Sequence, residues 1–315
     1  MWLWIVIILV VAFVVINAPG IFSRFYKASY TRRLGHLPML EQAQLGKRVL
    51  VLAPHPDDEV LACGGLIQKA HKAGLEVYIL WLTSGDGFEW DAVMVEHTLH
   101  PKGQAALELG QTRMGEALEA AQILGIPPER TFFLGYPDRG LLPMQSSYFN
   151  QPYRSPLTDV DSVPYSQALS PGATFTGANL QKDFQAVLDK VKPDHILCPS
   201  PVDAHPDHQG TAELTQRVMG ERGELHKITY WVVHGGAEWP LPKGYKAELP
   251  LEIPPRGHRL SWEVLPLEAE EIQLKHQATL AHKTQMTLLS HFMLAFVRQN
   301  ELFSLQPPEA SHNKA

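Results

Sequence analysis

The sequence RVLVLAPHPDDE occupies residues 48–59, and the change of character within it decides the fold. Its first half is apolar after Arg48, as in a short buried strand. A histidine and three carboxylates follow at once in a turn. Residues 60–73 then show helical periodicity, and Gly74 is placed to cap that helix. A strand, a polar turn and a helix in this order predict the first half of a βαβ unit.

The same alternation continues along most of the chain. Further strands are predicted at 75–83, 131–134, 195–198 and 228–233, and further helices at 104–124, 180–191, 211–219 and 268–289. Strands that alternate with helices of this length predict an α/β fold with a mostly parallel sheet and helices on both faces. Two stretches rich in proline and glycine, 136–179 and 236–260, break the pattern, and the first is expected to be a binding loop or lid.

Composition narrows the class of protein. The chain has 315 residues, of which 45% are apolar, so it can bury a sizeable core in one large domain or two small ones. A formal net charge of −6 without a basic stripe argues against a nucleic-acid partner. Its two cysteines, Cys63 and Cys198, exclude a disulfide framework and are expected to be small buried apolar residues.

The N-terminal run is apolar enough to enter a membrane. Residues 1–16 are all apolar, and no charge precedes Arg24. About 20 helical residues span the hydrocarbon core, so an N-terminal transmembrane helix is predicted, whereas a cleaved signal peptide would need a basic start that this run lacks. The predicted parts are an anchor at 1–22, a juxtamembrane linker at 23–46, a catalytic domain at 47–300 and a flexible tail at 301–315. The basic residues that follow the span place the catalytic domain on the cytoplasmic side of a single-pass membrane protein, by the positive-inside rule.

A second polar cluster, HPDH at residues 205–208, follows the predicted strand 195–198. Ligands of open parallel sheets bind beyond the carboxyl ends of the strands, so both clusters are expected to meet there. His55, Asp58 and His208 would give a metal three protein ligands and leave a position for water, which suits Zn²⁺. Two histidines and a carboxylate also suit Fe²⁺.

The remaining members of the clusters suit proton transfer. Neighbouring side chains in a turn do not easily point at one ion, so Asp57 is the candidate general base. His205, if cationic, would stabilise an oxyanion or protonate a departing amine, and Asp207 is placed to orient it. A helix N-terminus that favours acidic residues would explain positions 57–59 but not His55 or the second cluster.

Together, APHPDDE at 53–59 and HPDH at 205–208 resemble the PIG-L/LmbE-like family of metal-dependent N-deacetylases, which includes N-acetylglucosaminyl-phosphatidylinositol de-N-acetylase. Weaker similarity at 113–126, 134–138 and 275–285 extends the resemblance over roughly residues 47–290.

The resemblance implies a Rossmann-like fold and removal of an acetyl group from an N-acetylated sugar. It assigns Zn²⁺ to His55, Asp58 and His208, the base to Asp57 and electrostatic stabilisation to His205. It also suggests that Arg113 contacts substrate or supports a residue of the site, and that Asp138 contacts substrate. A surface ion pair with Glu116 and a turn-capping role are the respective alternatives. Some relatives have a tyrosine two residues before the His205 position, where this chain has Asp203. Either another group replaces it, such as one from 136–179, or the metal and His205 act alone.

An anchored deacetylase would meet lipid-linked substrates at raised local concentration, so a glycolipid carrying N-acetylglucosamine is the expected partner, with a soluble N-acetylated sugar conjugate as the alternative. Two other functions compete with this one. A non-heme Fe(II) oxygenase would use the same ligand types, but such sites are common on all-β barrels. An inactive membrane-tethered sugar-binding module would be expected to lack a ligand or the base, and none is missing.

Overall fold

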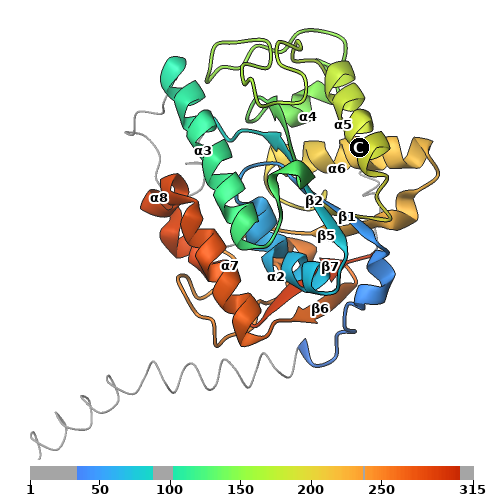
Figure 1. The fold of residues 1–315 in the computed structure, drawn as a ribbon, viewed down its shortest axis with the longest axis vertical. Helices are drawn as coiled ribbons and strands as arrows, with labels where there is room; N and C mark the ends of the chain where they lie inside the picture. Colours follow the sequence, from blue (N-terminus) through green and yellow to red (C-terminus); the bar gives the residue numbers. More distant parts are fainter. Residues whose placement is uncertain (1–33, 88–101, 237, 306–315) are drawn as a thin grey trace, which may run out of the picture.

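A seven-stranded sheet forms the centre of the molecule (Figure 1). The computed structural model describes residues 34–87, 102–236 and 238–305. The strand order is β3-β2-β1-β4-β5-β7-β6, in which β1 to β5 run parallel, and β7 is antiparallel to both of its neighbours. The strands are β1 Arg48–Ala53, β2 Glu76–Thr83, β3 Thr131–Tyr136, β4 His195–Pro199, β5 Ile228–Trp231, β6 Trp262–Pro266 and β7 Asn300–Ser304. The predicted mostly parallel α/β sheet is confirmed.

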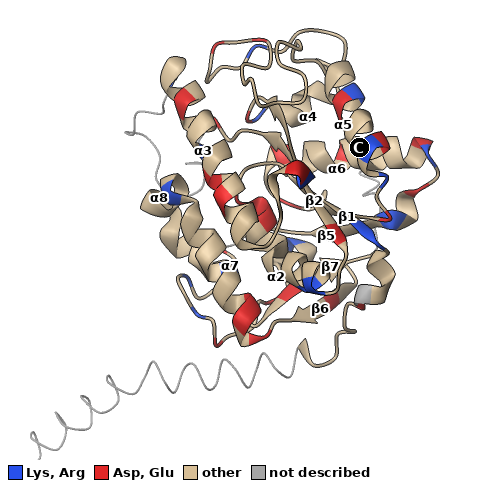
Figure 2. Cartoon of the chain, viewed as in Figure 1, with Lys and Arg blue, Asp and Glu red and all other residues tan. Residues whose placement is uncertain are grey.

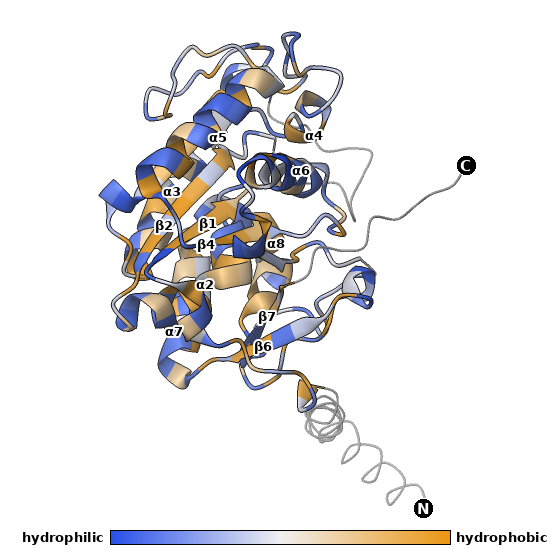
Figure 3. Ribbon diagram, turned by 90° about the vertical axis from the view of Figure 1, so that its right-hand side faces the viewer, coloured by the Kyte–Doolittle hydropathy of each residue, from blue (hydrophilic) through white to orange (hydrophobic). Residues whose placement is uncertain are grey.

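Helices cover both faces of this sheet. The α-helices are α2 Asp58–Lys72, α3 Gln104–Ile123, α4 Leu141–Met144, α5 Gly177–Val191, α6 Pro206–Glu221, α7 Ala269–Ala281 and α8 Lys283–Met293. Short 3₁₀ turns lie at Gln42–Leu45, Pro128–Arg130, Leu225–Lys227, Pro255–Gly257 and Leu294–Phe296. Helix α7 packs against both α2 and α3, while α5 packs against α6 (Figure 1). Strands covered in this way are apolar along their whole length, as β1 is after Arg48 (Figure 3).

The connections reverse direction between β1 and β4, which lie side by side. Strand β1 leads through α2 to β2 on one side, and β4 leads through α6 to β5 on the other. Their pairing aligns Val49 with His195 and Val51 with Leu197. Such a reversal opens a crevice beyond the carboxyl ends of the two strands. Both polar clusters enter that crevice, because one follows β1 and the other follows β4.

The C-terminal half of the sheet differs from the prediction. Residues 301–304, expected in a flexible tail, belong to β7, which lies between β5 and β6. The strand was not predicted because Glu301 lies in it, and a charged residue usually indicates an exposed position. Here its carboxylate is fully buried, accepts hydrogen bonds from the Gly65 and Leu66 amides, and lies 2.7 Å from Lys275 Nζ. The single helix predicted at 268–289 is also interrupted, at His282 (φ −78°, ψ 64°).

The excursion at 136–179 has little regular structure but is held against the sheet. Val163, Tyr165 and Phe175 are buried. The Leu169 amide donates to the Phe133 carbonyl, and the Tyr165 hydroxyl donates to Asp86 at 3.0 Å. This segment therefore reaches residues next to the β1–β4 crevice.

The N-terminus, the surface charge and the two cysteines were also the subject of predictions. The predicted anchor at 1–22 lies outside the described residues, and none of the helices within them has the length and apolar character needed to cross a membrane. Lys and Arg are interspersed with Asp and Glu in the view of Figure 2. Both cysteines are free thiols buried in the core, as expected.

Candidate active site

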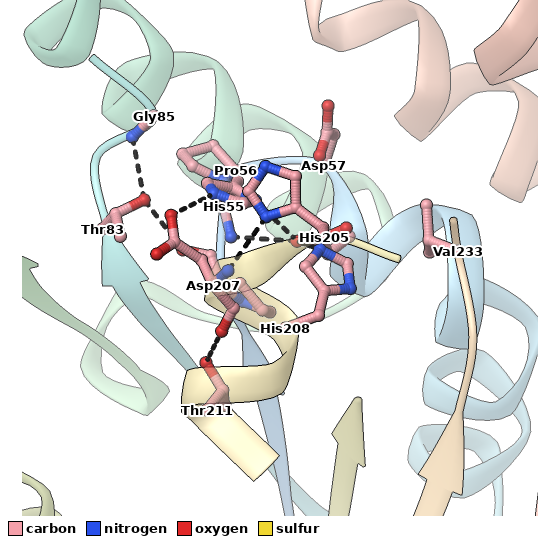
Figure 4. A network of polar contacts seen from close by, with 12 residues as sticks. His55, Pro56, Asp57, Thr83, Gly85, His205, Asp207, His208, Thr211 and Val233 are labelled. Atoms are coloured by element: carbon pink, nitrogen blue, oxygen red, sulfur yellow. Dashed lines mark hydrogen bonds and ion pairs between the residues drawn. The ribbon is translucent and has the colours of Figure 1, made fainter. Parts of the chain in front are cut away.

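The two polar clusters converge at the crevice, although His55 and Asp207 are 152 positions apart (Figure 4). The turn between β1 and α2 supplies His55. The N-cap and first turn of α6 supply His205 and His208. The His55 ring centroid lies 4.6 Å from that of His205 and 5.6 Å from that of His208. The distance between the clusters is therefore short enough for them to form one site.

Asp58 joins the two histidines that were predicted to share a metal with it. Its Oδ2 atom lies 3.3 Å from His55 Nδ1 and 3.2 Å from His208 Nε2. All three side chains are buried. Burial acts to raise the pKa of the Asp58 carboxyl, but His208 and His55 hold that pKa well below its usual value. Asp58 Oδ2 thus contacts one nitrogen of each histidine. The groups of described residues whose atoms lie close enough together to hold one ion are His55, His205 and His208; His55, Asp138, His205 and Asp207; and Asp58, His208 and His234.

The surroundings of His208 show whether the site fits a metal ion. Among the described residues, neither ring nitrogen of this fully buried side chain makes an aligned hydrogen bond, although Nδ1 lies 3.2 Å from Asp203 Oδ2. Burial lowers the pKa of His208, but the Asp203 and Asp58 carboxylates outweigh it and raise that pKa to about 10. The ring therefore lies between two anions that can balance either a proton or a cation. The donor set fits a divalent ion such as Zn²⁺ or Fe²⁺.

The second ring nitrogen of His55 contacts two buried carboxylates. His55 Nε2 lies 3.1 Å from Asp138 Oδ1 and 3.2 Å from Asp207 Oδ2. Asp207 also accepts hydrogen bonds from the Arg139 and Leu141 amides. A carboxylate behind a ligating histidine fixes the ring and its tautomer. Asp138 is only 1% exposed and its position supports this role, while its contact with a sugar stays a prediction.

His205 is partly exposed and faces the site from the start of α6. Its Nδ1 atom accepts a hydrogen bond from the Asp207 amide at 3.1 Å and so caps the helix. Because Nδ1 accepts, this arrangement describes a neutral ring with its proton on Nε2, instead of the cation considered from the sequence. Asp207 thus orients His205 through its main chain, while its carboxylate contacts His55.

Asp57, the predicted base, has a strained backbone. Its φ of 126° lies in a region that L residues rarely adopt. The Asp57 amide donates to Glu59 Oε2 at 3.1 Å, and its Oδ2 atom lies 3.6 Å from Arg113 Nη2. Arg113 is 3% exposed and also donates to the Pro56 carbonyl at 2.9 Å. Arg113 thus holds the turn that carries Asp57, which fits the contact behind the site considered from the sequence and not a surface pair with Glu116; a contact with substrate stays a prediction.

Two residues of the site were not predicted. Asp203 is fully buried and accepts hydrogen bonds from the amides of Val233, His234 and His205. It therefore supports His208 and the loop after β5, at the position where some relatives have the tyrosine. The His234 ring centroid lies 4.9 Å from that of His208 and 5.2 Å from that of His205. Its place just after the predicted strand 228–233 was the signal that could have identified it.

Asp86 extends the carboxylate network behind His55. It is 2% exposed and accepts a hydrogen bond from the Asp138 amide at 3.2 Å. Burial, followed by the charge of Asp138, raises the pKa of Asp86 to about 7. A carboxyl whose pKa is raised by folding binds its proton more tightly in the folded state. Its contribution to stability is therefore lost as the pH rises from about 4 to about 7.

Asp86→Asn is expected to remove this pH dependence, because the amide resembles the neutral acid. The free energy of unfolding of the variant, relative to that of the unsubstituted protein, should increase by about 3 kcal/mol between pH 5 and pH 8. Urea unfolding at both pH values measures the difference. Asp189→Asn, at a carboxylate with 70% exposure, is the control and should show little change. An equal difference at both pH values for Asp86→Asn would contradict the raised pKa.

Several known proteins are similar to this chain in sequence or in fold. A deacetylase of 1D-myo-inositol 2-acetamido-2-deoxy-α-D-glucopyranoside from Rhodococcus jostii is 27% identical over 271 residues, which cover 77% of this chain and 82% of that protein. Diacetylchitobiose deacetylase from Thermococcus kodakarensis is 26% identical over 52% of this chain and 45% of its own length. The structure of N,N'-diacetylchitobiose deacetylase from Pyrococcus horikoshii has the same fold, with a TM-score of 0.51 and 19% identity over 91% of this chain and 93% of that one. The family model described as GlcNAc-PI de-N-acetylase matches residues 50–219, more than half of the sequence, and the chain therefore belongs to the PIG-L family.

Proposed function

We propose that this protein is a metal-dependent N-deacetylase that hydrolyses the acetamide of an N-acetylglucosamine-containing substrate. The observation that carries the proposal is the position of Asp58 Oδ2, within 3.3 Å of one nitrogen of His55 and of His208, with Asp57 next to it in the chain. The deacetylases named among its relatives act on N-acetylated sugars, which supports the same class of substrate.

The reaction adds water to the acetyl carbon, breaks the C–N bond and releases acetate and a free amine. A bound divalent cation, Zn²⁺ in our proposal, would polarise the acetyl carbonyl and lower the pKa of water. His55, Asp58 and His208 would hold that cation. Asp138 and Asp207 fix the His55 ring, and Asp203 fixes the His208 ring.

Proton transfer is assigned to Asp57 and the oxyanion contact to His205. The Asp57 carboxylate is 14% exposed, so water can reach it. It takes a proton from the attacking water and returns it to the departing nitrogen. His205 carries its proton on Nε2 and directs it at the oxygen that gains negative charge, since its Nδ1 atom is occupied by the Asp207 amide.

The lipid-linked substrate and the membrane location are part of the proposal. Their support is the apolar run at residues 1–16 and the basic residues that follow it. We place the catalytic domain at the cytoplasmic face, where it would meet a glycolipid that carries N-acetylglucosamine.

Acetate release by the full-length protein, purified anaerobically in detergent, tests these points. Water-soluble and lipid-linked N-acetylglucosamine conjugates are compared before and after removal of metal with a chelator. We expect turnover to be lost with the metal and restored by Zn²⁺ or Fe²⁺, and to be faster on the lipid-linked substrate. Full turnover in metal-free protein would contradict metal dependence, and equal turnover of both substrates would contradict lipid specialisation. Dioxygen consumption with a 2-oxo acid would instead indicate the oxygenase.

A further inference from the structure

The strained turn at Asp57 is held by two helices outside the polar clusters. A non-glycine residue in such a conformation is strained and persists only when its surroundings fix it. Helix α3 contributes Arg113, and α8 contributes Gln285, to the same two acceptors, Pro56 O and Asp57 Oδ2. The position of the Asp57 carboxylate is thus set from outside its own turn.

Gln285 makes the closer of the two contacts with that carboxylate. Its side chain is 1% exposed. The amide Nε2 donates to Pro56 O at 2.7 Å and to Asp57 Oδ2 at 3.2 Å, whereas Arg113 Nη2 is 3.6 Å from the same Oδ2 atom. One NH₂ group therefore links the backbone of the turn to the side chain that it presents. The Gln285 amide therefore sets where the Asp57 carboxylate lies relative to the Pro56 carbonyl.

The orientation of the Gln285 amide is determined by its neighbours. The amide nitrogen must face Pro56 O, because two carbonyl oxygens in contact would repel each other. Gln285 Oε1 then faces the Thr284 hydroxyl at 2.6 Å. The single hydroxyl proton of Thr284 is shared between Gln285 Oε1 and Glu116 Oε2, at 2.6 and 2.7 Å, and the Glu116 carboxylate of α3 also accepts from the Thr284 amide at 3.0 Å. The start of α8 is therefore anchored to α3 directly beside the base.

We propose that Gln285 is a positioning residue for the reaction, which holds the Asp57 carboxylate at the place where it meets water, and that Thr284 keeps the Gln285 amide in register. This inference rests on the proposed function, in which Asp57 is the base. A displacement of about 1 Å in a reacting group lowers the rate about 10²-fold. Loss of the Gln285 donor leaves the predicted metal ligands in place, so it should affect turnover without affecting metal content.

The test uses Gln285→Met in the full-length, metal-loaded protein, because methionine keeps the length of the side chain and removes the donor. We expect kcat to fall about 10- to 100-fold, while KM and bound metal change by less than about twofold. Thr284→Val and Thr287→Val form a matched pair on the same helix. The Thr287 hydroxyl is exposed, and its hydrogen bond within the described part of the chain goes to the Lys283 carbonyl of the same helix. Thr284→Val should lower kcat in the same manner but less, and Thr287→Val should not.

Unchanged kcat in folded Gln285→Met would overturn the inference, as would a fall in kcat matched by a loss of metal or a rise in KM. If Gln285→Met does not fold, the difference between the two threonine variants decides the question. The proposed function fails separately, when the unsubstituted protein releases no acetate or when Asp57→Ala retains its turnover. Inactive Asp57→Ala together with fully active Gln285→Met would reject the role of Gln285 alone.

Discussion

Asp57→Gly is expected to lose most of its turnover, as Asp57→Ala is, but to be more stable to unfolding than Asp57→Ala. The Asp57 carboxylate is the proposed base, and general bases contribute about 10²- to 10⁴-fold to rates. Both Asp57→Gly and Asp57→Ala remove it, so both should lower kcat by that factor. They differ in the backbone, because φ at this position is 126°. Alanine keeps the Cβ atom that makes this conformation costly, and glycine does not.

The difference in stability between the two variants isolates this strain. Each loses the same contacts with Arg113 and Gln285, so these cancel in the comparison. Relief of about 1–3 kcal/mol, less the 0.5–1 kcal/mol or so that glycine loses in chain entropy, leaves roughly 1 kcal/mol in favour of glycine. Urea unfolding of the metal-free proteins measures it. Equal stability of the two variants would show that the turn is unstrained, and undiminished turnover would remove Asp57 from the mechanism.

The centre of the fold and the convergence of the clusters could be predicted because they depend on local sequence. Strands β1 and β4 are apolar after their first residues, Arg48 and His195, and each is followed by a polar turn and a helix. The rule that parallel strands present their carboxyl ends at one edge then brings His55 and His208 together without further information. Nothing in that argument requires knowledge of a contact between distant side chains.

The roles of the residues behind the site could not be predicted, because they depend on contacts between side chains that are distant in the sequence. The sequence identified Asp138 and Arg113 as candidates but not their contacts with His55 and Pro56, since residue type does not show which distant group a side chain holds. The buried pair of Lys275 and Glu301 concealed β7 in the same way, because charge in a sequence usually indicates solvent exposure. In each case the partner is far away in the chain, so burial and pairing are visible only in the fold.

The affinity of the site for metal is expected to fall steeply as the pH falls. In the metal-free protein, burial lowers the pKa of His208, while Asp203 and Asp58 outweigh that effect and raise it to about 10. The ring is therefore protonated at neutral pH, and a metal ion can bind Nε2 only after the proton has left. Each pH unit below 10 should cost about tenfold in affinity, which amounts to about 100-fold between pH 8 and pH 6.

Competition with a chromophoric chelator across this pH range measures the affinity, and calorimetry in buffers of different ionisation enthalpy counts the protons released. At least one proton per metal ion is expected at pH 7. Asp203→Asn provides the comparison, because it removes one of the two anions that stabilise the charged ring and so should flatten the pH dependence. The same change should weaken binding about 10- to 100-fold at pH 8, where the carboxylate orients His208 for the metal. Affinity that is independent of pH, with no proton released, would mean that His208 is neutral in the metal-free protein or is not a ligand, and the prediction that follows from its raised pKa would then have to be abandoned.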